Sequence, residues 1–355
     1  MSEGPIRPTP LAGLLPEEIT DGLSLEPAYR GRQIFRNIWS GVDDFAGMTD
    51  LPAPMREHLA AAGPLITSRV ERRFVDGDGS VKVRVRLEDG AALESVILKD
   101  DRGRLTLCLS TQVGCAMGCR FCATAAMGFQ RNAAAHEITE QVLLASRETD
   151  GISNIVFMGM GEPLLNLDNL RRSVAVLTHP LGLSLSPRRL TVSTCGITDG
   201  VRSLTEDGPP VRLAVSLQTA DPQLRGRLMP GAAAHPLDVL KDALLLYQRK
   251  TGFRITLEVV LLEGINDRVQ DVEEIARFAS GLRIVVNLIP WNPVAGLRFR
   301  SPAPSRIHAF RRRLESHRLA VTQRYRRGRG VRAACGQLFV PGDALQDSPD
   351  PPDSG

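Results

Sequence analysis

Four of the six cysteines in this 355-residue chain fall within one stretch, CLSTQVGCAMGCRFC, which runs from Cys108 to Cys122. Cys115, Cys119 and Cys122 form a C-x3-C-x2-C pattern, and its short loop lets three sulfurs converge on one metal centre. An iron–sulfur cube takes four ligands, so three thiolates would leave one iron open to a substrate or cofactor. The alternative is a structural zinc site with a distant histidine. Such zinc sites usually come as paired C-x2-C knuckles, and this chain has only one.

The cysteine count and the composition narrow the class of protein. Six cysteines are too few for a disulfide-built fold, and clustered cysteines in a reducing cytosol more often bind metal or do chemistry. No apolar run reaches the roughly 18 residues that a membrane helix needs. The N-terminal stretch is interrupted by Pro and acidic residues, unlike a signal peptide. We therefore expect a cytoplasmic protein without a membrane partner.

The distribution of charge suggests an acidic partner such as RNA. The formal net charge is +4, and between Arg298 and Arg332 the chain has twelve arginines and a single acid, Glu315. Nucleic-acid binding needs such a basic patch, because each neutralised phosphate releases counterions. A solvated helix face enriched in arginine by codon usage is the alternative.

The elements that must position the cysteines alternate regularly along the chain. We expect strands over residues 105–109, 154–158, 189–194, 211–217, 254–261, 284–289 and 319–324, and helices over roughly 134–149, 168–178, 197–206, 236–250, 269–280 and 302–317. Strands that alternate with helices indicate βαβ units and a parallel sheet, and hence an α/β fold. Six or seven such units can curl into a partial (β/α)6 barrel, and a flat doubly wound sheet is the alternative.

Motifs with chemically active side chains follow these strands one by one. The cysteine cluster follows the first strand, GMGEPLLN follows the second, STCG ends the third, SLQT ends the fourth, PWNP follows the sixth and AACGQL follows the last. In parallel α/β barrels the chemistry takes place at the C-terminal ends of the strands. The motifs should therefore share one rim of the barrel, which favours a catalytic cluster over structural zinc.

The remaining regions flank or complete this core. Residues 1–66 read as a helical accessory domain and are a candidate for docking RNA; AYRGRQIFRNIW in this region has helical spacing. Residues 67–100 alternate like strands around an Asp-Gly-Asp-Gly turn, which predicts a β-hairpin extension. Residues 101–340 form the core, including the loop with Cys335. Residues 341–355 are rich in Pro and Asp and read as a disordered tail.

The three-cysteine pattern after the first strand of an α/β barrel resembles the radical S-adenosylmethionine (SAM) enzymes, whose [4Fe–4S] cluster binds SAM through its open iron. A narrower resemblance extends from Arg30 to Leu338. RGRQIFRNIW, CLSTQVGC, FCAT, GFQRN, FMGMGEPLLN, LSPRRLTVST, EGIND, VNLIPWNP and AACGQL together resemble the RlmN/Cfr family. Members of this family are radical SAM methyltransferases that methylate a ring carbon of adenosine in RNA.

The resemblance implies roles for individual residues. Cys115, Cys119 and Cys122 would ligate the cluster, and the SAM contacts would be Gly161, Glu162, Ser193, Ser216, Leu217, Gln218 and Asn292. Cys335 would become an S-methylcysteine, and Glu94 would be the proton acceptor. Cys108 would resolve a protein–RNA adduct by forming a transient disulfide with Cys335. From its neighbours alone, Cys108 reads only as a small buried residue on a strand.

The implied reaction consumes two SAM molecules and methylates C2 of an adenosine in the peptidyl transferase centre of 23S ribosomal RNA, with transfer RNA as a second substrate. C2 is an electron-poor carbon that cannot attack a methyl group directly, so the methyl passes through Cys335 in a ping-pong mechanism. A low-potential reductant, such as a flavodoxin-like protein, is also implied, and we expect a monomer.

Two alternatives to this reaction remain at this point. A Cfr-type enzyme, which methylates C8 and confers resistance to ribosome-targeting antibiotics, shares the motifs. A non-catalytic iron–sulfur RNA-binding protein is the other alternative, and the presence of Glu94, Cys108 and Cys335 counts against it.

Two residues depart from the family pattern. Gln218 stands where the family usually has the histidine of SLH. Glutamine can donate and accept hydrogen bonds but cannot titrate near neutral pH, so we expect SAM binding to survive. Cys195 stands where the family usually has the second serine of STSG, and we interpret it as a packing substitution of similar size.

Overall fold

The computed structural model describes residues 10–149, 151–323, 328 and 330–339. The tail expected over residues 341–355 lies outside these residues. None of the helices in the described part of the chain combines the length and the apolar character of a membrane span.

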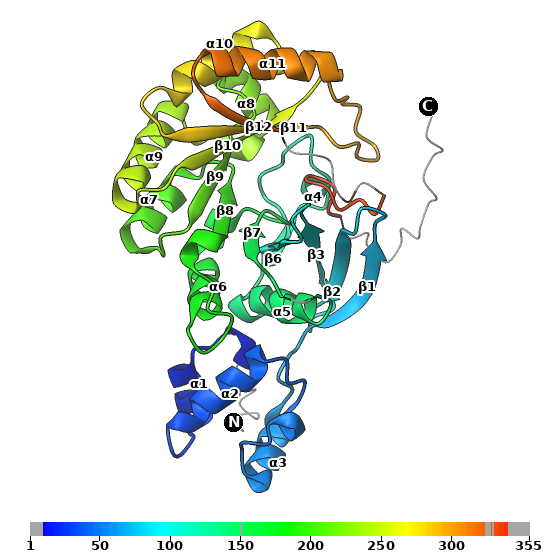
Figure 1. Ribbon diagram of the computed structural model, residues 1–355, viewed down its shortest axis with the longest axis vertical. Coiled ribbons are helices and arrows are strands. Elements are labelled where there is room, and N and C mark those ends of the chain that lie inside the picture. The colour runs from blue at the N-terminus through cyan, green and yellow to red at the C-terminus, as the bar shows by residue number, and fades with distance from the viewer. Residues whose placement is uncertain (1–9, 150, 324–327, 329, 340–355) are drawn as a thin grey trace, which may run out of the picture.

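The described residues contain one large sheet of ten strands, in the order β1-β2-β3-β4-β7-β8-β9-β10-β11-β12 (Figure 1). Its parallel part consists of β4 (Leu105–Cys108), β7 (Asn154–Phe157), β8 (Leu190–Thr194), β9 (Arg212–Ser216), β10 (Ile255–Leu261), β11 (Ile284–Pro290) and β12 (Ala320–Gln323). These strands follow the same order in the sheet as in the chain. A doubly wound sheet would reverse its order at a switch point, so the α/β partial barrel is confirmed and the flat alternative is wrong.

Helices cover the outer face of the parallel strands (Figure 1). They are α5 (Ala135–Ser146), α6 (Leu167–Thr178), α7 (Thr198–Asp207), α9 (Leu237–Thr251), α10 (Val269–Ala279) and α11 (Pro304–Ser316), all close to the expected bounds. The short helix α8 (Pro222–Leu228) between β9 and α9 was not expected, because seven residues are too few to show a helical period. Asp221 caps this helix by accepting hydrogen bonds from the backbone N–H groups of Gln223 and Leu224.

The N-terminal helices form a smaller body at the lower end of the molecule in Figure 1. They are α1 (Pro16–Gly22), α2 (Tyr29–Trp39) and α3 (Ala53–Ala62), with the 3-10 turns η1 (Leu11–Gly13) and η2 (Phe45–Gly47). Ile34, Phe35 and Ile38 on one face of α2 are buried in a cluster that also includes Leu143 of α5 and Val176 of α6. Apolar packing therefore attaches this body to the outside of the barrel.

The region expected to be one β-hairpin has three antiparallel strands. These are β1 (Arg69–Val75), β2 (Val81–Arg86) and β3 (Ala92–Lys99), and β3 pairs with β4, so they extend the main sheet. The expected turn over residues 76–79 is present between β1 and β2. A second turn at Asp89-Gly90 divides the following apolar run, and Gly90 has a φ of +87°, a conformation that glycine adopts readily. This second Asp-Gly pair in the sequence is the signal that would have predicted a third strand.

Candidate active site

A cavity of about 460 Å³ opens where the parallel strands end. Eleven of the thirteen residues expected at the site line it: Cys108, Cys115, Cys119, Cys122, Gly161, Glu162, Ser193, Ser216, Gln218, Asn292 and Cys335. The other two, Glu94 and Leu217, are fully buried outside its lining. The motifs that follow the separate strands are therefore brought together on one rim.

A small antiparallel hairpin holds the cysteine loop. Strands β5 (Gln112–Gly114) and β6 (Phe129–Asn132) pair at its base, and the short helix α4 (Ala123–Ala126) begins directly after Cys122. The backbone N–H of Cys115 donates to the carbonyl of Gly128 at 2.9 Å. Gly114 permits this closure, because its φ is +77° and a Cβ there would lie 1.7 Å from the same carbonyl oxygen.

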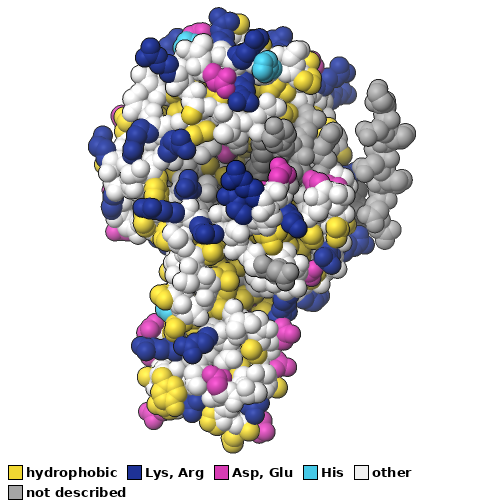
Figure 2. Space-filling model, in the orientation of Figure 1, with side chains coloured by type: hydrophobic (Ala, Val, Ile, Leu, Met, Phe, Trp, Pro, Cys, Tyr) yellow, Lys and Arg dark blue, Asp and Glu magenta, His cyan; other side chains and the backbone are white. Residues whose placement is uncertain are grey.

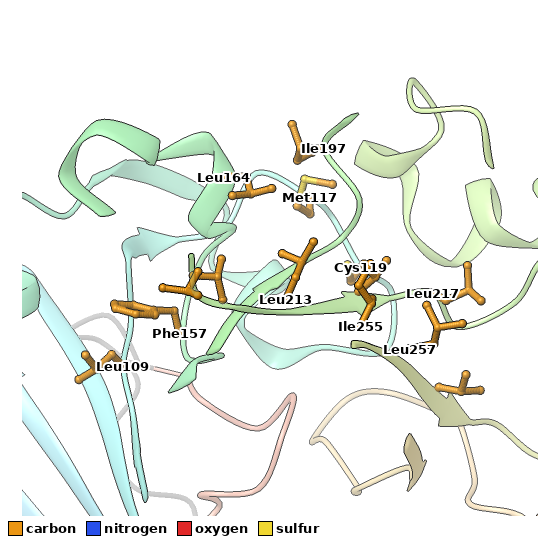
Figure 3. Close-up of a cluster of buried hydrophobic side chains, with 14 of the residues drawn as sticks. Leu109, Met117, Cys119, Phe157, Leu164, Ile197, Leu213, Leu217, Ile255 and Leu257 are labelled. Carbon is orange, nitrogen blue, oxygen red and sulfur yellow. The ribbon is translucent and has the colours of Figure 1, made fainter. Parts of the chain in front are cut away.

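The cysteine loop also packs into the core of the barrel. Met117 and Cys119 belong to the same buried apolar cluster as Leu213 and Leu217 around β9 (Figure 3). This packing fixes Cys119 at the inner end of the loop, while Cys115 and Cys122 are partly buried.

The three thiols of the cysteine loop are suitable ligands for an iron–sulfur cluster. Burial raises the pKa of the Cys115 thiol to about 12, and burial also raises the pKa of Cys122. Buried thiols of this kind become thiolates when a metal centre supplies the compensating positive charge. Among the described residues, no three His, Cys, Asp or Glu side chains are grouped closely enough to hold a single metal ion. A four-iron cube is larger than one ion and bridges thiolates that stand further apart.

Cys195 lies beside this loop, on the end of β8. Its Sγ is 4.0 Å from the Sγ of Cys119, and it also lines the cavity. The hydrogen bond with Cys119 and burial raise the pKa of Cys195 well above its ordinary value. Cys195 therefore packs against the cysteine loop, and its interpretation as a packing substitution stays a prediction.

The glycine-rich loop after β7 places an acid at the cavity wall. Gly161 has a φ of +101°, and a Cβ there would lie 2.6 Å from the side chain of Gln112, so only glycine fits. Glu162 accepts hydrogen bonds from the backbone N–H groups of Cys195 at 2.6 Å and Leu164 at 3.1 Å. Burial raises the pKa of Glu162, and these two hydrogen bonds oppose the rise because they stabilise the carboxylate.

At the end of β9, Gln218 forms part of the wall with a backbone φ of +64°. Its side-chain Oε1 accepts a hydrogen bond from the backbone N–H of Val260 at 2.6 Å. Its carbonyl accepts from Asn266 Nδ2 at 2.9 Å. Gln218 therefore connects β9 to β10, while its neighbour Leu217 points into the core rather than the cavity.

The loop that carries Cys335, near the C-terminal end of the described chain, forms one wall of the cavity. Asn292 Nδ2 donates to the carbonyl of Cys335 at 3.2 Å, and the backbone N–H of Ala123 donates to the carbonyl of Gly336 at 2.7 Å. Cys108 packs in one apolar cluster with Ala333 and Leu338, which flank Cys335 in the chain. Residues more than two hundred positions apart thus meet at this wall, and none of the six cysteines is in a disulfide.

Glu94 of β3 is buried outside the cavity lining, next to the loop that carries Cys335. Its carboxylate pairs with Arg84 at 3.1 Å and with Lys82 at 3.3 Å, and it accepts a hydrogen bond from the backbone N–H of Phe339 at 3.1 Å. Burial lowers the pKa of Lys82, although the charge of Glu94 acts in the opposite direction. The side chain is not the exposed, solvated glutamate that is usual on strands.

Sequence reasoning did not identify two charged residues near the cavity. Glu258 of β10 lines the cavity, and its carboxylate accepts a hydrogen bond from Asn287 Nδ2 at 2.7 Å. The sequence signal for Glu258 is that it is the one acid inside the apolar run ITLEVVL, where a charged side chain is unusual. Arg225 of α8 is buried next to Cys195, and nothing in the pattern of LRGRL distinguished it from a surface arginine.

The described arginines of the stretch from residue 298 to 332 are mostly exposed, but several are already paired with acids of the same chain. Three arginines of α11 form ion pairs at the surface: Arg306 with Asp267 at 2.7 Å, Arg311 with Glu315 at 2.8 Å and Arg313 with Glu273 at 3.4 Å. On the face shown in Figure 2, Lys and Arg side chains are spread over the barrel and do not gather in one patch. Residues 324–327 and 329 of this stretch lie outside the described residues.

Comparison with known proteins gives a consistent result. The family model described as the radical SAM superfamily matches residues 109–279. A probable dual-specificity RNA methyltransferase RlmN of Treponema pallidum is 46% identical over 328 residues, which cover 92% of this chain and 96% of the relative. The dual-specificity RNA methyltransferase RlmN of Nitratidesulfovibrio vulgaris is 43% identical over 326 residues, covering 88% of both chains.

Among solved structures, a radical SAM methyltransferase from Sphaerobacter thermophilus superposes with a TM-score of 0.89 at 39% identity, covering 93% of this chain and 99% of that chain. Radical SAM enzymes use a [4Fe–4S] cluster and SAM, and the three thiols on the cavity wall fit such a cluster. Because the likeness to the RlmN proteins extends over nearly the whole chain, this protein belongs to the RlmN family of radical SAM methyltransferases.

Proposed function

We propose that this protein methylates C2 of an adenosine in the peptidyl transferase centre of 23S ribosomal RNA, and also acts on transfer RNA. The relatives are named dual-specificity RNA methyltransferases, which supports an RNA substrate. The observation that carries the proposal is the shared cavity, whose lining includes the three loop cysteines together with Cys108 and Cys335. A binding protein would not need two further thiols facing the same space.

The loop cysteines Cys115, Cys119 and Cys122 would hold the cluster, with SAM on its open iron. A bound cluster and SAM would together supply a 5′-deoxyadenosyl radical. Glu162 can accept a hydrogen bond from the ammonium of SAM, and Gly161 lets the backbone approach it. Ser193, Ser216, Gln218 and Asn292 line the same cavity and would contact its other polar groups.

Cys335 would carry the methyl group between SAM and the RNA. Its thiolate would attack the methyl carbon of a first SAM and displace S-adenosylhomocysteine, which forms S-methylcysteine. After a hydrogen atom has passed from the S-methyl group to the 5′-deoxyadenosyl radical, which becomes 5′-deoxyadenosine, the S-methylene carbon would bond to C2 of the adenine and link the protein to the RNA. The cysteine needs to reach both SAM and RNA, and a loop at the mouth of the cavity suits this requirement.

Glu94 and Cys108 would complete the turnover. Glu94 would accept the proton that leaves C2, which requires the Phe339 amide to move from the carboxylate. The Cys108 thiolate would then attack the sulfur of Cys335. The bond between the Cys335 sulfur and the methylene carbon would break and a Cys108–Cys335 disulfide would form. The carbon on C2 would take up a proton to become the methyl group, and the unpaired electron of the adduct would pass to the oxidised cluster. Thiol–disulfide exchange would then restore both thiols.

The central experiment is mass spectrometry of digested ribosomal and transfer RNA from a host with and without the gene. We expect 2-methyladenosine to be lost with the gene. The appearance of 8-methyladenosine instead would assign a Cfr-type reaction. Anaerobically reconstituted protein should also cleave SAM to 5′-deoxyadenosine under strong reductant, and absence of cleavage would favour a non-catalytic RNA-binding protein.

The partners follow from this chemistry. A low-potential electron donor such as a flavodoxin-like protein would reduce the cluster, and RNA would dock on the N-terminal helices and the arginine-rich stretch. We place this reaction in the cytoplasm, where ribosomal and transfer RNA are modified, with the protein acting as a monomer.

A further inference from the structure

The side chain of Arg225 is buried beside the cysteine loop, although it lies outside the cavity lining. It is 2% exposed and sits on α8, the short helix that follows β9. Its Nη1 donates to the carbonyl of Ala232 at 3.0 Å, and its Nη2 donates to the carbonyl of Cys195. Gly196 leaves room for the guanidinium, because a Cβ there would lie 2.9 Å from Nη2.

This guanidinium has no carboxylate partner among the described residues. Its two hydrogen bonds go to neutral carbonyls, and its Nε has no hydrogen-bond partner in the described part of the chain. A buried charge is costly unless an opposite charge compensates it, and arginine does not lose its proton in proteins. Within the part of the chain that the structure describes, Arg225 therefore lacks a carboxylate as counter-charge.

The groups whose negative charge acts on Arg225 are the sulfurs of Cys195 and Cys119. Burial lowers the pKa of Arg225, and the thiolate forms of Cys195 and Cys119 oppose this, because they favour the guanidinium. Cys195 Sγ is 4.0 Å from Cys119 Sγ, so the guanidinium, Cys195 and Cys119 follow one another toward the cavity. A cube held by three thiolates has a net negative charge, which increases by one unit on reduction.

We propose that Arg225 is a positioning residue whose fixed positive charge, held behind Cys195 and Cys119, stabilises the reduced cluster and raises its reduction potential. This inference rests on the proposed cluster site at Cys115, Cys119 and Cys122. Net charge around an iron–sulfur cluster is among the factors that set its potential. The buried position matters, because a charge in the interior is screened much less than one at the surface.

The test is a redox titration of the full-length protein, reconstituted anaerobically and followed by electron paramagnetic resonance of the reduced cluster. We expect Arg225→Gln to lower the ratio of reduced to oxidised cluster at least tenfold at a fixed ambient potential, a shift of about 59 mV for one electron. Arg225→Lys keeps the charge and should recover most of this loss. Arg227→Gln is the matched control, because Arg227 lies on the same helix but is exposed.

The outcomes separate this inference from the proposed function. If wild-type protein binds no cluster by iron and sulfide content, the proposed function fails. If wild type and Arg225→Gln bind equal clusters with equal potentials, only the role of Arg225 is overturned. Should the glutamine variant not fold, Arg225→Met is used. If neither neutral variant folds without cluster while the lysine variant does, the charge serves the polypeptide itself, and the inference is again overturned.

Discussion

The carboxylate of Glu94 accepts a hydrogen bond from the backbone N–H of Phe339 at 3.1 Å, and this contact joins β3 to the loop that carries Cys335. The same carboxylate compensates the charges of Arg84 and Lys82. Glu94 is thus a structural anchor as well as the proposed proton acceptor, and a mutation will affect both stability and turnover.

Replacement of Glu94 by glutamine should separate these two roles. The variant leaves two cations without compensation, and breaking a buried ion pair from one side costs about 3–5 kcal/mol of the free energy of unfolding. Methylation of Cys335 precedes proton removal and should survive. The RNA adduct should then accumulate, because C2 cannot lose its proton. Denaturant unfolding and gel electrophoresis of the RNA–protein species measure the two effects.

Arg84→Gln is the control for Glu94→Gln, because it breaks the same ion pair from the other side and retains the carboxylate. It should lose stability but should not accumulate adduct. Equal adduct levels in both variants would show that the effect arises from disruption of β3 and not from a missing base.

Replacement of Cys108 by alanine should trap the RNA at a later step. Cys108 packs against the residues that flank Cys335, so its loss removes the attacking thiol with little change in volume. We expect a covalent RNA–protein species that strong denaturant does not dissociate. The double variant Cys108→Ala, Cys335→Ala should show none. Normal release of methylated RNA by the single variant would disprove the resolving role.

Alkylation of the loop cysteines should depend on pH in a defined direction. In protein without cluster, burial raises the pKa of Cys115 to about 12 and also raises that of Cys122. The thiolate is the reactive form, so alkylation by iodoacetamide should be slow at neutral pH and should increase as the pH rises toward 12. Peptide mass spectrometry measures the modified fraction.

The control for the alkylation experiment is the same protein in denaturant, where the thiols should react with a midpoint near the ordinary cysteine pKa of about 8.5. Loading of the cluster should protect Cys115 and Cys122 at every pH. Fast alkylation of both cysteines in folded, cluster-depleted protein at pH 7 would contradict the raised pKa of their thiols.

The alternation of strands and helices could be predicted from the sequence because each element is marked by residues close to it in the chain. Each apolar run such as Ile284–Pro290 is bounded by turn residues, and a strand followed by a helix allows few topologies. The same logic predicted that Glu162 and Asn292 would share a rim, since both follow parallel strands. The short helix α8 and the division of the 67–100 region carried weaker signals, and both were missed.

Contacts made by distant parts of the chain could not be predicted from the sequence in the same way. The pairing of Glu94 with the Phe339 amide joins residues 245 positions apart, and no period or motif encodes it. Arg225 was likewise missed because its burial depends on the space beside Gly196. Such positions are defined by tertiary packing, and propensity and pattern carry no information about them.

The indole of Trp291 connects the end of β11 to the cysteine loop, because its Nε1 donates to the carbonyl of Phe121 at 3.0 Å. Trp291→Phe keeps most of the apolar volume but leaves this buried carbonyl unsatisfied, at a cost of about 1.4 kcal/mol. If this cost destabilises the closed conformation of the cysteine loop, a chelator should remove iron from the cluster roughly tenfold faster. The absorbance of the cluster gives the rate.

Trp39→Phe removes the same atoms from the chain's other tryptophan, which lies on α2 outside the cavity lining, and should leave the rate of iron loss unchanged. The expected order is therefore fast loss in Trp291→Phe and equal, slow loss in Trp39→Phe and wild type. If both variants lose iron at the same increased rate, general destabilisation explains the effect, and the Trp291–Phe121 hydrogen bond has no special role in holding the cysteine loop closed.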